Sequence, residues 1–416
     1  MIHPEHLHAK KFIFEALHLQ QVLPELVAAQ QMCTRDWEYL LHIAQIHRLG
    51  PMLYVRLKRE DLVSAIPEKV QRQLKKAHRR HTFRNLNIYR ELVSVTRILE
   101  SANIPSIALK GAFLAYFAYP DVGMRPMRDL DLLLPPEQAI QAFELLKAHG
   151  YKPMFDGAPE AYFADRIHLP PLTGPGGITI ELHHRLTAPD SNANGFEHAL
   201  WARSISIMVG GTHVKFLSHE DLLLHLCIHA ILDHQLDLGP LSLADVALLI
   251  ESKPVDWQLF LSIVVAGGWQ RCVLPLLSLA KSHLGAKVPD EIMVALGGTH
   301  CEPVWLESAE YLVFSDPADH KLLDYDVQEM LYAGNAFKRL SALIGIAFPP
   351  RATIARHFPV SADSFVAYLY YPRRWYRLLT GKLPSLLKAH SGREGTMREL
   401  ALQRNALSRW LKAAAK

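Results

Sequence analysis

One change of pattern along the chain constrains its fold more than any other feature. Between Ile104 and about Val214, short apolar runs are separated by Pro and Gly, as in strands joined by turns. On both sides of this segment, apolar residues recur three and four positions apart, which is the spacing of helices that bury one face. The sequence therefore predicts an α/β module between two α-helical parts.

Four regions follow from this pattern and from the distribution of charge. The chain has 416 residues and a net charge of +4, whereas residues 351–416 carry 13 Lys and Arg against 3 Asp and Glu. Binding to a polyanion is therefore expected only from particular parts of the chain. We expect an α-helical N-terminal region over 1–103, the α/β module over 104–217, an α-helical domain over 218–350 and a basic helical region over 351–416.

A second basic feature lies in the N-terminal region. Five cations recur along one side of the helix predicted over residues 69–84, and they form either a solvated face or a stripe that faces phosphate groups or a polynucleotide. These cations are Lys69, Arg72, Lys76, Arg79 and Arg80.

Other features of the composition bear on the location of the protein. The four cysteines lie far apart without a CxxC pair, so neither a zinc ribbon nor a disulfide framework is indicated. The N-terminal residues lack an apolar stretch followed by small residues, and the longer apolar runs are interrupted before about 18 residues. We expect a cytoplasmic protein without a signal peptide or a membrane span.

The α/β module is expected to contain four strands and two helices. Two of the strands should form a hairpin across the Gly- and Pro-rich residues 174–177. The expected strands are Ile104–Leu109, Arg128–Leu134, Ile167–Leu172 and Ile178–His184, and the expected helices are Gly111–Tyr119 and Glu137–His149.

Two aspartates lie on one side of the strand predicted over Arg128–Leu134. Residues two apart on a strand point to the same side, so Asp129 and Asp131 project together while the leucines between them face the core. Such carboxylates repel each other unless a cation lies between them, and hard oxygen ligands suit Mg²⁺ or Mn²⁺ bound together with substrate phosphates. The alternative is an exposed edge strand with two surface aspartates.

A third carboxylate comes from the strand predicted over Ile178–His184. Alternation places Glu181 and His183 together on the polar side of that strand. If the strand lies beside that of Asp129 and Asp131, three carboxylates converge on one face, which is the set that two-metal phosphoryl transfer needs. A polar residue that points outward is the alternative interpretation of Glu181.

Four residues near the aspartates are candidates for phosphate binding. Lys110 and Gly111 lie where a strand ends and a helix is expected to begin, so a glycine that allows close approach and a positive helix end would be available to a triphosphate. Arg125 and Arg128 could clamp phosphate or balance the carboxylates. Solvent-exposed arginines are the alternative.

A competing group lies in the C-terminal half. Spacings of four place His225, His229 and Asp233 on one face of a helix, and such a face could bind Zn²⁺ or, with Asp245, form a metal-dependent phosphohydrolase site. The apolar neighbours of these residues favour a role in packing or in lining a substrate site.

Together, these motifs resemble a known family. The dipeptide Lys110-Gly111 and the segments Arg125–Leu133 and Ile180–His183 are similar to the signature of an uncharacterised nucleotidyltransferase family within the polymerase β-like superfamily. The likeness covers about half of the chain. Two helical segments share it, His47–Leu53 and Ser218–His229.

The resemblance implies a polymerase β-like core, which is a small mixed sheet with helices, within an α+β protein. It also implies that Asp129, Asp131 and Glu181 bind Mg²⁺ or Mn²⁺, and that Lys110 and Gly111 hold the phosphates of an NTP.

One position departs from the pattern of the superfamily. The usual motif has Gly followed by Gly or Ser, whereas Ala112 follows Gly111 here and offers no hydroxyl to a phosphate. Phosphate binding through Lys110 takes its place in our interpretation.

The motifs together predict a metal-dependent nucleotidyltransferase that moves an NMP group from an NTP such as ATP to an acceptor and releases pyrophosphate. The balanced charge of residues 1–350 favours a small molecule, a peptide or a protein as the acceptor over a long nucleic acid. Two alternatives remain open. One is a catalytically silent module that binds a nucleotide or a partner, and the other is a nucleic-acid-binding protein that uses the basic stripe and the basic tail.

Overall fold

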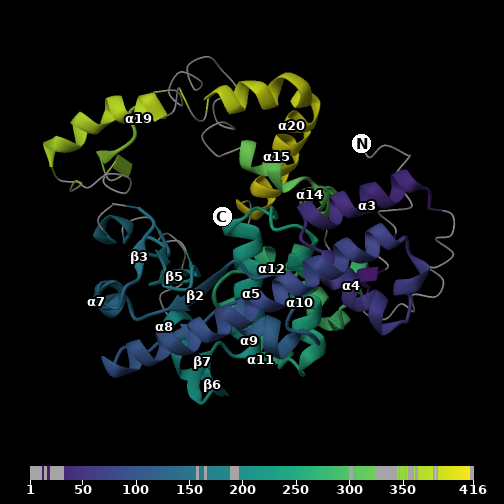
Figure 1. Ribbon diagram of the computed structural model, residues 1–416, viewed down its shortest axis with the longest axis horizontal. Coiled ribbons are helices and arrows are strands. Elements are labelled where there is room, and N and C mark those ends of the chain that lie inside the picture. Colours follow the sequence, from purple (N-terminus) through teal and green to yellow (C-terminus); the bar gives the residue numbers. More distant parts are fainter. Residues whose placement is uncertain are drawn as a thin grey trace.

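A mixed sheet is flanked by helices in the computed structural model of this protein. In Figure 1 the strands lie to the left, helices α3 and α4 lie to the right, and α9, α10 and α12 lie in the middle. This arrangement confirms the predicted α+β class. The structure describes residues 12–13, 16–18, 32–155, 159–163, 166–187, 196–298, 303–323, 344–345, 347–351, 353–354, 360, 364–377, 380 and 383–412.

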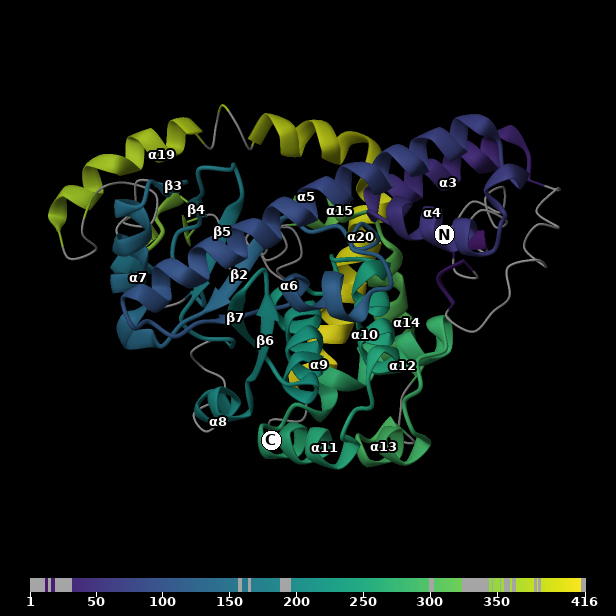
Figure 2. The ribbon, with the colours of Figure 1, turned by 60° about the horizontal axis from the view of Figure 1, so that its bottom comes forward.

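The N-terminal helices join the two sides of the molecule. The longest of them, α5, has 34 residues and so extends over about 51 Å at 1.5 Å per residue. It packs against α4 along one part of its length and against α7, β2 and β7 along another, as Figure 2 shows. The elements of this part are α3 (Thr34–Ile46), α4 (Gly50–Arg59), η3 (Val63–Ala65) and α5 (Glu68–Ser101).

The basic stripe predicted on residues 69–84 lies on α5, and its five cations are exposed. Two of them have carboxylate partners nearby, since Lys69 lies 3.4 Å from Glu38 and Arg72 lies 3.2 Å from Glu68. Both interpretations of the stripe therefore stay open.

Seven strands form one sheet in the order β3-β4-β5-β2-β1-β7-β6. The strand of the two aspartates, β2, pairs antiparallel with β1 and parallel with β5. The strand of Glu181 therefore lies beside the strand of the two aspartates, which is the condition on which the predicted convergence depended. The strands are β1 (Ile107–Ala108), β2 (Asp129–Leu133), β3 (Lys152–Pro153), β4 (Leu172–Thr173), β5 (Thr179–His183), β6 (Ile205–Val209) and β7 (Thr212–Phe216).

Three predicted elements of the module differ from the structure. The strand predicted over Ile104–Leu109 is reduced to the two residues of β1. The strand predicted over Ile167–Leu172 is reduced to the two residues of β4, because Pro170 and Pro171 have no N–H group to donate to a neighbouring strand. The helix predicted over Gly111–Tyr119 is a short α6 (Gly111–Phe113) followed by a π-helical turn, η4 (Leu114–Ala118).

The hairpin of β6 and β7 was not predicted. Its turn is Gly210-Gly211, in which both residues have positive φ angles of 54° and 76°. A Gly-Gly pair between strands is a recognisable hairpin signal because glycine adopts this conformation without steric cost.

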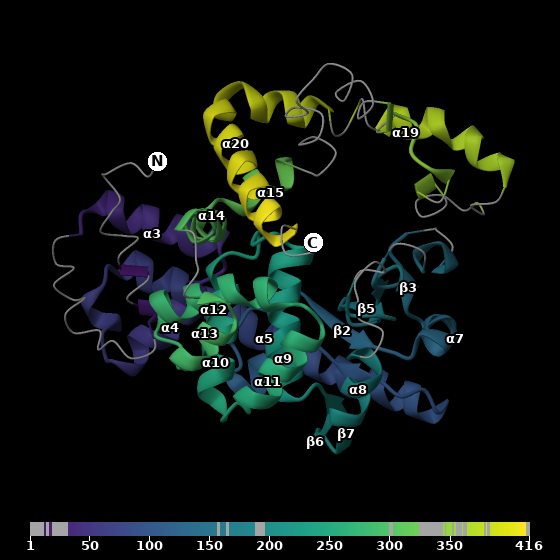
Figure 3. The ribbon, with the colours of Figure 1, turned by 180° about the vertical axis from the view of Figure 1, so that it is seen from behind.

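The remaining helices flank the sheet and form the C-terminal part (Figure 3). Helix α20 packs along α14, where the rings of Trp305 and Trp410 stack at 4.7 Å. These elements are α7 (Pro136–Ala148), η5 (Pro159–Tyr162), α8 (Phe196–Arg203), α9 (His219–Ile228), η6 (His229–Asp233), α10 (Pro240–Ser252), α11 (Trp257–Ala266), α12 (Gln270–Leu284), α13 (Asp290–Ala295), α14 (Pro303–Phe314), α15 (Pro317–Leu322), η8 (Phe365–Tyr370), α19 (Tyr371–Arg377) and α20 (Leu383–Lys412).

A single cluster of buried apolar side chains runs through the sheet and the helices that flank it, from Leu40 in α3 to Leu407 in α20. Among the described residues, none of the helices has the length and apolar character needed to span a membrane.

Candidate active site

The seven residues that the sequence predicts to bind the metal ion or the phosphates all line one cavity of about 200 Å³. The same cavity is also lined by residues that lie far away in the sequence, among them Arg48, His229, His234 and Asp245. The predicted residues are Lys110, Gly111, Arg125, Arg128, Asp129, Asp131 and Glu181.

The register of β2 and β5 brings the carboxylates together. Asp131 lies directly opposite Glu181 in this parallel pair. Single ligand atoms of Asp131, Glu181 and His183 all lie within 4.8 Å of one another, which is close enough to share a metal ion. Asp129 is outside this group but lines the same cavity. The structure thus adds His183, which comes from the same strand as Glu181, to the predicted set.

Asp131 is held by two buried partners. Lys110 Nζ lies 3.4 Å from Asp131 Oδ1, and His183 Nε2 donates a hydrogen bond of 3.0 Å to the same oxygen. Burial by itself raises the pKa of Asp131, but Lys110 and His183 outweigh this effect and hold the pKa well below its usual value. Asp131 is therefore a charged carboxylate whose orientation is set by its neighbours.

Asp129 has the opposite electrostatic character. Burial, together with the charges of Asp131 and Glu181, raises the pKa of Asp129 to about 6. The positively charged side chains of the cavity wall therefore do not neutralise the whole negative charge of the three carboxylates. A bound cation would remove this repulsion, so the donor set fits a divalent metal ion.

The structure changes the explanation for the Lys110-Gly111 turn. Helix α6 is only three residues long, so it provides no extended helix whose positive end could bind a triphosphate. A Cβ atom at Gly111 would lie 2.5 Å from Nη1 of Arg125, so a larger residue here would force the side chain of Arg125 to shift. Lys110 adopts a φ of 43° and is 8 % exposed.

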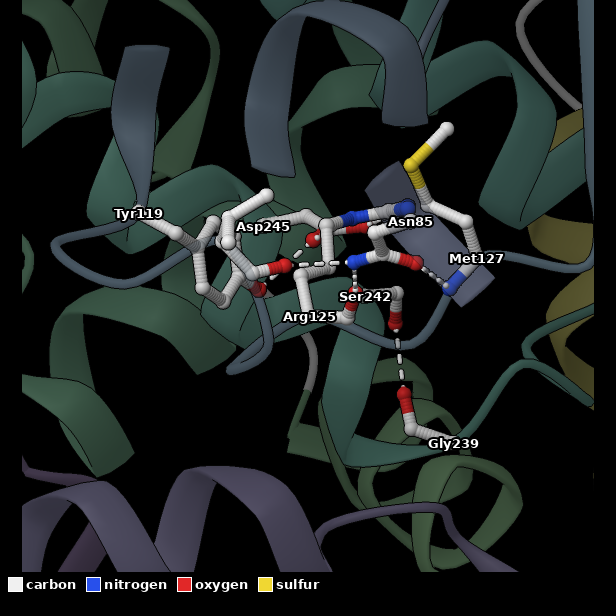
Figure 4. A network of polar contacts seen from close by, with 8 residues as sticks. Asn85, Tyr119, Arg125, Met127, Gly239, Ser242 and Asp245 are labelled. Atoms are coloured by element: carbon white, nitrogen blue, oxygen red, sulfur yellow. Dashed lines mark hydrogen bonds and ion pairs between the residues drawn. The ribbon is translucent and has the colours of Figure 1, made fainter. Parts of the chain in front are cut away.

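Arg125 has a buried partner in Asp245, and its charge also acts to lower the pKa of Asp129. Its Nε and Nη2 atoms donate to the two carboxylate oxygens of Asp245, each at 2.7 Å. Tyr119 donates to the same carboxylate at 2.7 Å, and Figure 4 shows both side chains directed at Asp245. A bidentate pair of this kind fixes both side chains in one geometry. Because Asp245 belongs to α10, the pair holds the loop before β2 against that helix.

A hydrogen-bonded side chain of α5 fixes the same loop. Asn85 donates to the carbonyl oxygen of Arg125 at 2.8 Å and accepts from the backbone N–H of Met127 at 3.3 Å (Figure 4). The loop that carries Arg125 and leads to Asp129 is therefore held on two sides.

Comparison with known families agrees with this geometry. A family model described as an uncharacterised nucleotidyltransferase matches residues 34–285, which is more than half of the chain. The chain belongs to this family. A search of curated proteins finds no match.

The matched region contains the elements that build the cavity. It begins at the first residue of α3 and ends at Gly285, directly after α12, and so includes the whole sheet. Membership in a nucleotidyltransferase family supports a transferase activity, with an NTP as the substrate.

One member of the competing histidine group, His229, lines the same cavity. Helix α9 ends at Ile228, and His229 and Asp233 lie in the π-helical turn that follows, where they contact each other at 3.1 Å. Asp245 is occupied by Arg125, so the predicted phosphohydrolase arrangement does not form. His225 is 1 % exposed and is not among the residues that line the cavity.

Sequence reasoning missed two residues of this site. Strand alternation does place His183 on the same face as Glu181, but His183 was not among the predicted ligands. Arg48 lies in the segment His47–Leu53 that shares the family resemblance, but nothing in that segment assigns it a role, because it reaches the cavity only through the tertiary fold.

Proposed function

We propose that this protein is a metal-dependent nucleotidyltransferase that moves an NMP group from an NTP to an acceptor and releases pyrophosphate. The observation that carries this proposal is the pairing of β2 with β5, which places three carboxylates and Lys110 around one cavity. The family match supports the same reaction class.

Asp129, Asp131 and Glu181 would hold Mg²⁺ or Mn²⁺, and the chemistry that such an ion supplies is neutralisation of phosphate charge and activation of the attacking hydroxyl. The position of His183 supports a role beside Asp131, because its hydrogen bond keeps that carboxylate in one orientation. Lys110 and Arg128 would contact the phosphates.

The reaction would be an in-line displacement at the α-phosphate. An oxygen or another nucleophile of the acceptor forms a bond to the α-phosphorus, the bond to the oxygen that bridges to the β-phosphate breaks, and the proton of the acceptor leaves to solvent. ATP is one candidate donor, and a small molecule, a peptide or a protein is the candidate acceptor.

A specific observation favours a second function, a catalytically silent module that binds a nucleotide or a partner. Lys110 and His183 both contact one oxygen of Asp131 already, and Ala112 replaces the residue that offers a hydroxyl in the superfamily. A protein that had lost its chemistry could retain this ion pair as a structural contact.

Pyrophosphate release distinguishes the two functions. The purified full chain would be incubated with each of the four NTPs, with Mg²⁺ or Mn²⁺, and with cell extract depleted of small nucleotides as the source of acceptor. The proposal requires metal-dependent pyrophosphate release that EDTA stops and that the Asp129→Asn variant lacks. ATP binding without pyrophosphate release under any of these conditions would support the silent module.

Glu181→Gln is expected to lower turnover much more than it weakens NTP binding. Glu181 lies on β5, whereas both aspartates lie on β2 and would keep the ion that accompanies the nucleotide. The measurement is turnover together with the Kd for ATP by calorimetry. Equal losses in turnover and in ATP affinity would contradict the proposal that Glu181 binds only the ion that activates the acceptor.

Lys110→Ala is expected to weaken ATP binding by about ten- to a hundredfold, because a charge-assisted contact to phosphate contributes roughly 1.5–3 kcal/mol. Adenosine binding should barely change. If ATP affinity is unchanged and Mn²⁺ binds more tightly, Lys110 serves only as the partner that it already is for Asp131, at 3.4 Å.

A further inference from the structure

Arg48 occupies a backbone position that disfavours arginine. It follows the last turn of α3 with a φ of 59°, and the N–H of Leu49 donates back to the carbonyl oxygen of Ala44 at 2.8 Å. This is a helix ending in which glycine is the preferred residue, because an L side chain in the left-handed region is strained.

Two other helices of the protein end in the same way with a residue other than glycine at this position. Asp61 follows α4 with a φ of 56°, and Asn103 follows α5 with a φ of 56°. In each case the next N–H donates to the carbonyl oxygen five residues earlier, at 2.8 and 3.0 Å respectively. Asp and Asn are the residue types that tolerate this region best after glycine, whereas arginine has no such advantage. Backbone geometry therefore does not explain the arginine at position 48.

The side chain of Arg48 lines the cavity of the three carboxylates, beside Arg128. Within the described part of the chain, the guanidinium groups of Arg48 and Arg128 have no hydrogen bond or ion pair at contact distance. Burial, together with the charges of Arg128 and Arg125, lowers the pKa of Arg48 to about 10. Three guanidinium groups thus gather near the cavity, and the charge of only one of them, Arg125, is matched by a paired carboxylate.

The charges of the cavity indicate which ligand would satisfy the two arginines. Lys110 pairs with Asp131, and Arg125 pairs with Asp245. Among the described residues, no Lys or Arg pairs with Asp129 or Glu181, and these two carboxylates, together with Asp131, remain for a cation. Arg48 and Arg128 therefore remain for an anion, and an NTP that carries one divalent ion still has net negative charge on its phosphate chain.

We propose that Arg48 and Arg128 bind the terminal phosphates of the NTP, which leave as pyrophosphate. This assignment rests on the proposed function, because it takes the ligand of the cavity to be a nucleoside triphosphate. It also accounts for the arginine at the end of α3, since a side chain that binds phosphate offsets the strain of its backbone.

Arg48→Gly separates a role in binding from a role in folding, because glycine is the residue that this helix ending prefers. Isothermal titration calorimetry would measure the binding of ATP, adenosine and sodium tripolyphosphate to the full chain in the presence of Mn²⁺. We expect the affinity for ATP and tripolyphosphate to fall by about ten- to a hundredfold, the affinity for adenosine to stay the same and the Tm to hold or rise. Arg48→Lys should recover part of the loss.

Asn103→Gly is the matched control, since it makes the same backbone change at the end of α5, outside the cavity. It should hold or raise the Tm and leave all three affinities unchanged. Unchanged affinity for tripolyphosphate in Arg48→Gly would overturn the proposal, and so would a marked fall in Tm, which would make Arg48 a structural counter-charge for Asp129 or Asp245.

The wild-type protein distinguishes this inference from the proposed function. If it binds tripolyphosphate through Arg48 but releases no pyrophosphate from any NTP, the enzyme assignment fails and the phosphate site stands. If it binds neither ATP nor tripolyphosphate, both proposals are wrong.

Discussion

Asp129→Asn and Asp131→Asn should each lower metal-dependent turnover by about a thousandfold or more, because each removes a carboxylate from the proposed metal site and several kcal/mol of transition-state stabilisation with it. Pyrophosphate release at saturating NTP and Mn²⁺ would measure this loss. Full turnover in both variants would contradict the catalytic assignment.

The two variants should differ in stability. The ionised form of Asp129 is disfavoured by burial and by neighbouring carboxylates, so Asp129→Asn should hold or raise the Tm of the metal-free protein above pH 6. Asp131 has a buried partner in Lys110, so Asp131→Asn leaves that lysine without its counter-charge. This variant should lower the free energy of unfolding by about 3–5 kcal/mol. Equal Tm values for the two variants would contradict the pairing seen in the structure.

Asp245→Asn is expected to destabilise the protein by about 3–5 kcal/mol, because it leaves the buried guanidinium of Arg125 without a counter-charge. The side chains of the pair are 12 % and 7 % exposed, and two hydrogen bonds of 2.7 Å join them. Urea denaturation followed by tryptophan fluorescence would measure the change. Activity should fall as well, because Arg125 anchors the loop that leads to Asp129.

Two controls distinguish the buried pair from an ordinary surface contact. Tyr119→Phe removes only one hydrogen bond to Asp245 and should cost about 1 kcal/mol. Glu251→Gln disrupts the exposed pair with Lys287, in which the side chains are 45 % and 61 % exposed, and should cost less than about 1 kcal/mol. A loss in Asp245→Asn no greater than in Glu251→Gln would contradict the structural role of the Arg125–Asp245 pair.

Much of the site could be predicted because strand periodicity is a local property. Alternation alone placed Asp129 and Asp131 on one side of β2 and Glu181 on the polar side of β5. The composition of the hairpin turn at residues 174–177 likewise predicted the antiparallel pairing of β4 with β5. The apolar spacing in α7 predicted its extent to within about one residue at each end.

By itself, the sequence determined which segments alternate as strands, which repeat as helices, and which carboxylates share a side, because each of these follows from backbone geometry over a few residues. Only the tertiary structure decided which charged side chains pair with each other and which of them line the cavity. Arg125 stands near the aspartates in the sequence, yet it binds Asp245, 120 positions away. Arg48 reaches the same cavity from the end of α3. These contacts depend on how distant elements pack and on which buried charges must be neutralised. Neither of these produces a repeating pattern in the sequence.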